Sequence, residues 1–118
     1  MATDQLSQVF AALADPTRRA MLERLGQGTL TVTQLAEPFP ISLPAISRHL
    51  KVLEEAGLVS RDRRAQWRPS SLRGESLAEA RAWMDGLLGP WDHRMDRLAD
   101  HLARRRTTTA TTRGKDTP

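Results

Sequence analysis

The segment from Ser42 to Gly57 combines a helix start, an amphipathic helix and a helix stop, and it constrains the fold more than any other part of the chain. Ser42 can accept a bond from a backbone N–H group at the helix start, and Pro44 falls in the first turn, where no intrahelical donor is needed. Gly57 can adopt the left-handed conformation that ends many helices. These signals enclose one helix of about 14 residues.

This helix has an apolar face and a short, polar, basic face. Ile46, Leu50 and Leu53 recur at helical spacing, so they are expected to face a core. The other face consists of Leu43, Ala45, Ser47, Arg48, His49 and Lys51. A basic outer face of this kind is typical of a helix that reads DNA.

The residues before this helix predict a shorter helix and a tight turn. Thr31 and Gln34 have the spacing of a capping box, which starts a helix over about residues 32–37. Pro38 and Pro40 prevent its continuation and place a turn between the two helices. Two helices joined in this way form a helix-turn-helix.

The residues after the helix predict a β-hairpin, or wing. Leu58–Ser60 has strand character, Arg61–Gln66 is a polar tip, and Trp67–Leu72 is expected to be the return strand, with Pro69 at an edge or an end. Trp67 is expected to pack within the wing rather than to stack on a base. The wing completes a winged helix-turn-helix.

Positive charge is concentrated in this part of the chain. Residues 42–73 contain seven basic and three acidic residues, a net charge of +4, whereas residues 1–41 sum to −1 and residues 74–102 to −3. The last segment, 103–118, carries another +4. The helix-turn-helix and wing are therefore expected to face a polyanion.

Two further helices are predicted at the N-terminus. Asp4 can open the first, which ends at Asp15, and Pro16 begins the second, which runs to about Leu25. Arg18 and Arg19 on the second helix are expected to be solvated or paired with carboxylates rather than to contact DNA.

These segments together resemble the ArsR/SmtB family of bacterial winged helix-turn-helix transcriptional regulators. The most specific parts are Leu13-Ala14-Asp15-Pro16-Thr17-Arg18-Arg19 and Ser47-Arg48-His49-Leu50-Lys51, and the resemblance extends over about residues 5–103. It implies a mainly α fold of about five helices with a small β-hairpin wing. It also implies an operator-binding homodimer, usually a repressor, that dimerises through its first and last helices.

Within this interpretation, Arg48 is the candidate for a bidentate contact to guanine, with Ser47 as a second reader. Ser42 and Lys51 are expected at phosphates, and the wing along the adjacent backbone or minor groove. His49 is as compatible with packing between helices as with a phosphate contact. The expected DNA-binding residues are Ser42, Leu43, Ala45, Ser47, Arg48, His49, Lys51, Arg61, Arg63, Arg64, Gln66 and Arg68.

The region from Ser76 to Arg105 carries a long apolar stripe that predicts how the protein assembles. Its members are Leu77, Ala80, Met84, Leu87, Trp91, Met95, Leu98 and Leu102. A helix carrying this stripe would be about 39 Å long, too long for a core this small to cover. A second copy is expected to cover it. The predicted dimer interface comprises Leu6, Phe10, Leu13, Met84, Leu87, Trp91, Met95, Leu98 and Leu102.

Gly89-Pro90 interrupts this stripe without changing its period, so one kinked helix is favoured over two separate helices. We expect residues 1–103 to form the DNA-binding and dimerisation domain. Residues 104–118 form a basic, Thr-rich tail without apolar periodicity, which is expected to be disordered. The polar N-terminus and the absence of a membrane-length apolar run predict a cytoplasmic protein.

A metal-responsive repressor is the main alternative. The chain has no cysteine, which excludes thiolate sites, but the last helix carries Asp92, His93, Asp96, Asp100 and His101. His93 and His101 are eight residues apart and cannot share an ion on one helix. These residues are interpreted as an exposed acidic face, a site across a dimer remaining the alternative, and no metal or cofactor is expected.

Two other classes of function fit these residues less well. No nucleophile, base and orienting residue can be assembled from the sequence, so an enzyme is not expected. A winged helix that binds protein or RNA could use the same arginine-rich wing. The Ser47-Arg48-His49 run and the family resemblance favour duplex DNA, and no motif indicates a particular effector.

Overall fold

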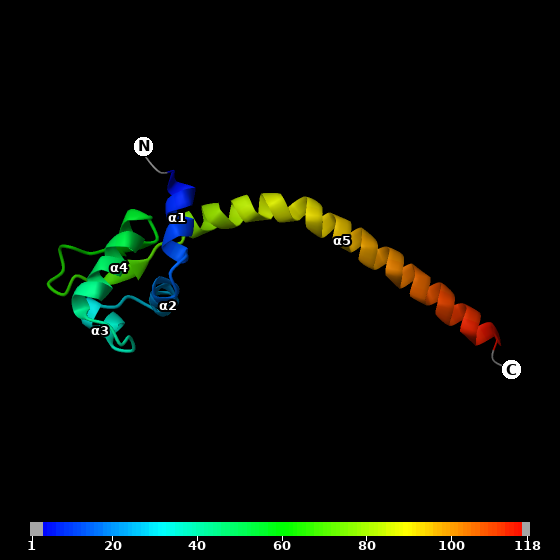
Figure 1. Ribbon diagram of the computed structural model, residues 1–118, viewed down its shortest axis with the longest axis horizontal. Coiled ribbons are helices and arrows are strands. Elements are labelled where there is room, and N and C mark those ends of the chain that lie inside the picture. Colours follow the sequence, from blue (N-terminus) through cyan, green and yellow to red (C-terminus); the bar gives the residue numbers. More distant parts are fainter. Residues whose placement is uncertain (1–3, 117–118) are drawn as a thin grey trace. The chain divides into compact units, whose positions relative to one another are not determined.

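The computed structural model describes residues 4–116, with side chains up to Arg106, and its elements match the predicted fold class. Five helices and a two-stranded antiparallel hairpin follow one another within these residues (Figure 1). The chain divides inside its last helix into two compact units, residues 1–81 and residues 82–118. The elements are α1 (Gln5–Leu13), α2 (Pro16–Leu25), α3 (Val32–Ala36), α4 (Leu43–Glu55), β1 (Val59–Arg61), β2 (Ser70–Leu72) and α5 (Glu75–Asp116).

The predicted helix starts are confirmed by their capping bonds. The Asp15 carboxylate accepts backbone N–H bonds from Thr17 and Arg18 at the start of α2. At α3, Thr31 and Gln34 form the reciprocal capping box. At α4, the Ser42 hydroxyl accepts the N–H group of Ala45, which confirms the start of the predicted DNA-reading helix.

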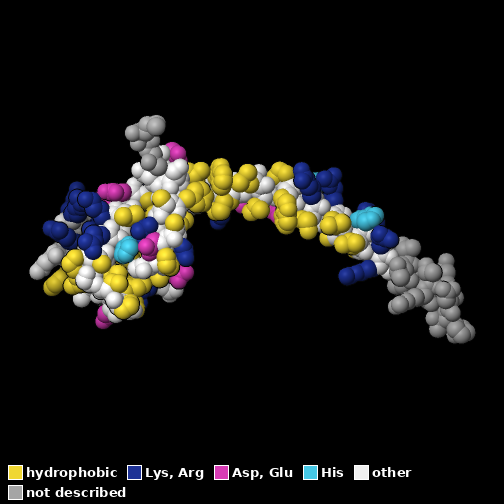
Figure 2. Space-filling model, viewed as in Figure 1, with side chains coloured by type: hydrophobic (Ala, Val, Ile, Leu, Met, Phe, Trp, Pro, Cys, Tyr) yellow, Lys and Arg dark blue, Asp and Glu magenta, His cyan; other side chains and the backbone are white. Residues whose placement is uncertain are grey.

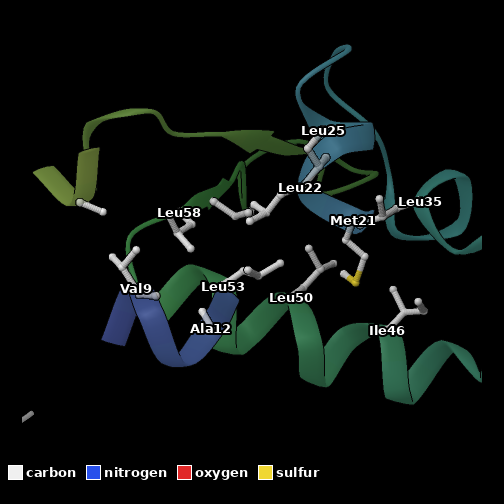
Figure 3. Packing of buried hydrophobic residues seen from close by; sticks show 13 residues of the cluster. Val9, Ala12, Met21, Leu22, Leu25, Leu35, Ile46, Leu50, Leu53 and Leu58 are labelled. Carbon is white, nitrogen blue, oxygen red and sulfur yellow. The ribbon is translucent and has the colours of Figure 1, made fainter. Parts of the chain in front are cut away.

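The core of the first unit lies between α4 and the helices packed on it (Figure 3). Ile46, Leu50 and Leu53 of α4 are fully buried, as their spacing predicted. Figure 3 shows them facing Met21 of α2 and, farther along α4, Ala12 of α1. The buried apolar residues are Val9, Ala12, Met21, Leu22, Leu25, Leu35, Ile46, Leu50, Leu53, Ala56, Leu58, Val59 and Ala80. This packing fixes the direction in which the opposite face of α4 points.

The wing is shorter than predicted. Val59 pairs with Leu72 and Arg61 with Ser70, so the return strand begins at Ser70. The expectation that Trp67–Pro69 belongs to this strand is wrong. Arg68 has a positive φ of 43°, and Pro69 has no N–H group to donate to a ladder.

The last helix, α5, continues through Pro90, so the prediction of one helix rather than two is confirmed. It extends to Asp116, beyond the domain boundary proposed at residue 103 from the sequence. Side chains beyond Arg106 lie outside the described residues, and that boundary remains a prediction. None of the described helices is long and apolar enough to cross a membrane.

Candidate nucleic-acid interface

The outer face of α4 presents two cationic side chains. Arg48 and Lys51 are exposed, and neither forms a salt bridge within residues 4–106. Leu43 is half exposed at the start of the helix, and the Ser42 hydroxyl lies 3.3 Å from the Ala45 nitrogen that it caps. α4 therefore offers an unneutralised positive face on the side opposite its buried leucines.

The less exposed members of the predicted set lie at the edges of this face. Ala45, Ser47 and His49 are half-buried. Nδ1 of His49 lies 3.4 Å from Nη1 of Arg18, so the histidine packs between α4 and α2. This contact favours the packing interpretation of His49, and a phosphate contact by its other ring nitrogen remains a prediction.

Arg18 joins three helices. Its Nε donates to the carbonyl oxygen of Ala12 at 2.8 Å, and Nη2 donates to that of Ala11 at 3.0 Å, both at the end of α1. Its carboxylate contact, with Asp15, is longer at 3.9 Å. Arg19 donates to the carbonyl oxygen of Leu13 at 2.7 Å. The two arginines thus bind the end of α1, a role that the sequence analysis did not anticipate.

The backbone N–H groups of Arg18 and Thr17 hold the pKa of Asp15 below its usual value. Burial opposes this effect and is second in size to the bond from Arg18, and the positive charge of Arg18 lowers the pKa further. Asp15 is therefore a charged cap on α2 that also supports the arginine joining the three helices.

The wing loop, which we define as residues 62–69, is bound to α4 by one ion pair. Nη2 of Arg63 lies 3.0 Å from Oε1 of Glu54. Arg63 was predicted as a DNA contact, and the structure gives it a bond to the helix instead of leaving it unpaired. This bond connects the position of the wing to that of α4.

The other predicted DNA contacts on the wing loop are Arg64, Gln66 and Arg68, which are exposed and have no carboxylate partner within residues 4–106. Figure 2 shows dark blue side chains gathered over this part of the molecule. Arg61, also in the predicted set, is half-buried, and its Nε is buried without an acceptor. The outer loop is therefore better placed than the wing base to contact phosphates.

The indole of Trp67 does not pack within the wing. It is 72% exposed, which makes the packing expectation wrong. The sequence pattern missed this because it assigned Trp67 to a strand, whereas the chain leaves the ladder at Arg61 and rejoins it at Ser70.

The apolar stripe of α5 changes character along the helix. Leu77 packs against the core and Ala80 is buried, whereas from Trp83 on every large apolar side chain in the described part is exposed. Figure 2 shows the yellow side chains in a row along this helix. Leu88 and Trp83 are exposed beside the predicted interface residues and were not included among them. The exposed set is Trp83, Met84, Leu87, Leu88, Trp91, Met95, Leu98 and Leu102.

The residues of α1 that were predicted to pack with this stripe contribute to the first unit. Leu6, Phe10 and Leu13 are half-buried and pack against the core of the first unit.

Among the described residues, no three His, Cys, Asp or Glu side chains lie close enough together to hold a metal ion.

Comparison with known proteins places this geometry among transcriptional regulators. A helix-turn-helix domain family matches residues 13–62. The transcriptional repressor SdpR of Bacillus subtilis is 38% identical over 88 residues, which are 75% of this chain and 98% of SdpR.

Solved structures give the same result for the fold. A crystal structure of an ArsR family transcriptional regulator, RHA00566, superposes with a TM-score of 0.71 at 37% identity, covering 75% of this chain and 98% of that one. The homodimeric winged helix-turn-helix DNA-binding domain of Mb0332 from Mycobacterium bovis has a TM-score of 0.59 at 29% identity, covering 73% and 80% of the two chains.

Proposed function

The chain belongs to the ArsR family of winged helix-turn-helix DNA-binding transcriptional regulators, and we propose that it is a repressor that binds an imperfect palindrome as a homodimer without metal. The observation that carries this proposal is the outer face of α4. Arg48 and Lys51 project from a helix whose other face is fully buried, and no carboxylate of the described residues neutralises them. A helix presented in this way fits the major groove of duplex DNA.

The contacts divide into those that read bases and those that position the protein. Arg48 is exposed near the middle of α4 and can donate two bonds to the O6 and N7 atoms of guanine. Lys51, one turn later, is assigned to a phosphate, together with Arg64 and Arg68 of the wing loop. Arg63 acts first through Glu54, by holding the loop against α4.

The proposed dimer rests on the exposed apolar side chains of α5. Trp91 is 54% exposed and Leu87 60%, and a continuous row of such residues is costly to leave in water. A second copy offers an identical row, which a two-fold axis would bring together with α1. The relative Mb0332, described as homodimeric, supports this assignment. Two recognition helices related in this way would read half-sites about 34 Å apart.

The proposal of repression rests on the similarity to SdpR, which is named a transcriptional repressor. The proposal of metal independence rests on the donor set. The chain contains no cysteine. Among the described residues, no three His, Asp or Glu side chains lie close enough together to bind a metal ion. We expect the regulator to act in the cytoplasm.

The test is binding of the purified protein to the DNA upstream of its own gene across a salt series, against unrelated DNA. Tight binding that depends on a palindrome and is indifferent to added zinc or nickel supports the proposal. Release by metal would instead support a site across the dimer, and equal affinity for all DNA would remove sequence-specific regulation.

Arg48→Ala identifies the reading residue within the same assay. It should relax the base preference at one position in each half-site, because a bidentate contact to guanine contributes about 1–3 kcal/mol of discrimination. Arg97→Ala is the matched control, since Arg97 is an exposed arginine of α5 outside the proposed interface. Unchanged base preference in Arg48→Ala would reject the assignment of Arg48.

A further inference from the structure

Trp67 is the most exposed of the large apolar side chains in the described part of the chain. Its exposure of 72% exceeds that of the two tryptophans of α5, Trp83 at 50% and Trp91 at 54%. An indole has a large apolar surface with a single N–H donor, and it gains most when that surface is covered and its rim stays hydrated. Trp67 is not part of the hydrophobic core of the first unit.

Trp67 lies in a loop that is closed by hydrogen bonds. Asp62 donates its N–H group to the carbonyl oxygen of Pro69 at 2.9 Å and accepts the N–H group of Arg64 at 3.0 Å. Arg68 donates its N–H group to the carbonyl oxygen of Ala65 at 3.1 Å and adopts a positive φ of 43°. These bonds close a turn around Trp67 and direct the chain so that the indole is not returned to the core.

The residues near Trp67 in the sequence indicate what could cover its indole. Arg64 and Arg68 flank it in sequence, both exposed, and Gln66 adds a polar side chain. The one acid of the loop, Asp62, already accepts a backbone bond. The wall of a DNA minor groove alternates apolar deoxyribose faces with phosphates. A flat apolar side chain between cationic residues is complementary to such a surface.

The loop also belongs to the proposed DNA-binding surface. The ion pair between Arg63 and Glu54 connects the first part of the wing loop, four positions before Trp67, to α4, the helix that carries Arg48. When α4 occupies a major groove, a wing attached to it reaches the adjacent backbone and minor groove.

We propose that Trp67 is a DNA-contacting residue that lays its indole against the sugars of the minor groove next to the half-site read by α4. This inference rests on the proposed function. The contact buries apolar surface and neutralises no phosphate, so it adds affinity without adding counterion release. Arg64 and Arg68 have the opposite signature, because they bind phosphates.

The salt dependence of operator binding separates these roles. Trp67→Ala is expected to weaken binding about tenfold at every salt concentration, the range found when an aromatic contact to nucleic acid is removed, and to leave the slope of log K against log salt unchanged. Trp67→Phe should recover most of the affinity. Arg64→Ala, the charge control, should flatten the slope by about one unit.

A direct readout comes from the fluorescence of a Trp83→Phe/Trp91→Phe protein, in which Trp67 is the remaining tryptophan. Operator DNA should change its emission and protect it from acrylamide, saturating at one protomer per half-site. If this double variant does not fold or does not dimerise, the affinity series in the otherwise unchanged protein decides alone.

The inference is overturned if Trp67→Ala binds the operator as tightly as the unaltered protein. It is also overturned if that variant loses affinity only because it dissociates into monomers, which sedimentation at the assay concentration would reveal. Failure of the unaltered protein to bind any upstream DNA would reject the proposed function itself, a result distinct from either of these.

Discussion

Nη1 of Arg18 lies 3.4 Å from Nδ1 of His49, and this contact joins α2 to the middle of α4. A guanidinium can only donate, so Nδ1 of His49 accepts this bond only when it carries no proton. The same guanidinium binds two carbonyl oxygens at the end of α1. One side chain therefore connects a helix of the proposed dimer interface to the helix proposed to read DNA.

Arg18→Ala is expected to destabilise the protein by about 1–3 kcal/mol, because it leaves the carbonyl oxygens of Ala11 and Ala12 without their charged donor. The free energy of unfolding in urea measures this change. Arg19→Ala is the control, since it removes one bond from an exposed side chain and should cost less. Equal effects of the two substitutions would contradict the joining role of Arg18.

The same network predicts a pH dependence of stability through Asp15. Its pKa is lowered in the folded protein from the ordinary value of 3.8, chiefly by the N–H group of Arg18. A lowered folded pKa means that the charged carboxylate stabilises the fold above pH 3.8 and that this contribution is lost as the pH falls through the folded value.

Asp15→Asn tests this, because asparagine keeps the cap geometry and loses the charge. Unfolding free energies of the two proteins should differ near neutral pH, and the difference should shrink as the pH falls below 3.8. A difference that stays constant down to the lowest accessible pH would show that the charge of Asp15 is not responsible.

Replacement of Gly57 by a residue with a side chain is expected to destabilise the protein for two physical reasons. Its φ is +76°, and a Cβ there would lie 2.7 Å from Oγ of Ser76 and 3.0 Å from Nε2 of Gln5. Gly57→Ala should therefore lower the unfolding free energy by about 1–3 kcal/mol. Gly74→Ala is the matched control, because no atom lies within 4 Å of a Cβ at that position. Thermal unfolding of the two variants side by side gives the comparison, and equal melting temperatures would be the contrary result.

Much of this fold could be predicted because its signals are local. A cap bonds residues two or three positions away, as at Asp15, Thr31 and Ser42, and a helical face repeats every three or four positions, as at Ile46, Leu50 and Leu53. These features depend on short stretches of chain, so the helix-turn-helix follows from them.

The predictions from sequence were wrong or incomplete for residues whose hydrogen-bond partners lie in another element, and for residues beside an unusual backbone conformation. The acceptor of Arg63 is Glu54, nine positions earlier in another element. The acceptors of Arg18 are backbone carbonyl groups, which no pattern of side-chain types can predict. Trp67 was assigned to a strand because its neighbours fit one, and the positive φ of Arg68 prevented that strand. Contacts between a side chain and another helix or strand can be identified only once the three-dimensional structure is known.

The proposed dimer gives the last prediction, which concerns the exposed row on α5. Leu98 is 47% exposed and lies toward the C-terminal end of the described part of that row, so Leu98→Glu would place a charge in the proposed two-fold interface. We expect sedimentation at micromolar concentration to give a monomer for this variant and a dimer for the unaltered protein. His93→Glu, which puts the same side chain at an exposed position of α5 outside the row, should remain dimeric. Because Leu98 contributes nothing to the core of the first unit, helix content should be preserved, and the monomer should lose operator affinity through the loss of its second half-site. A monomer from both variants would show a general sensitivity of α5 to added charge, and a dimer from both would place the interface elsewhere.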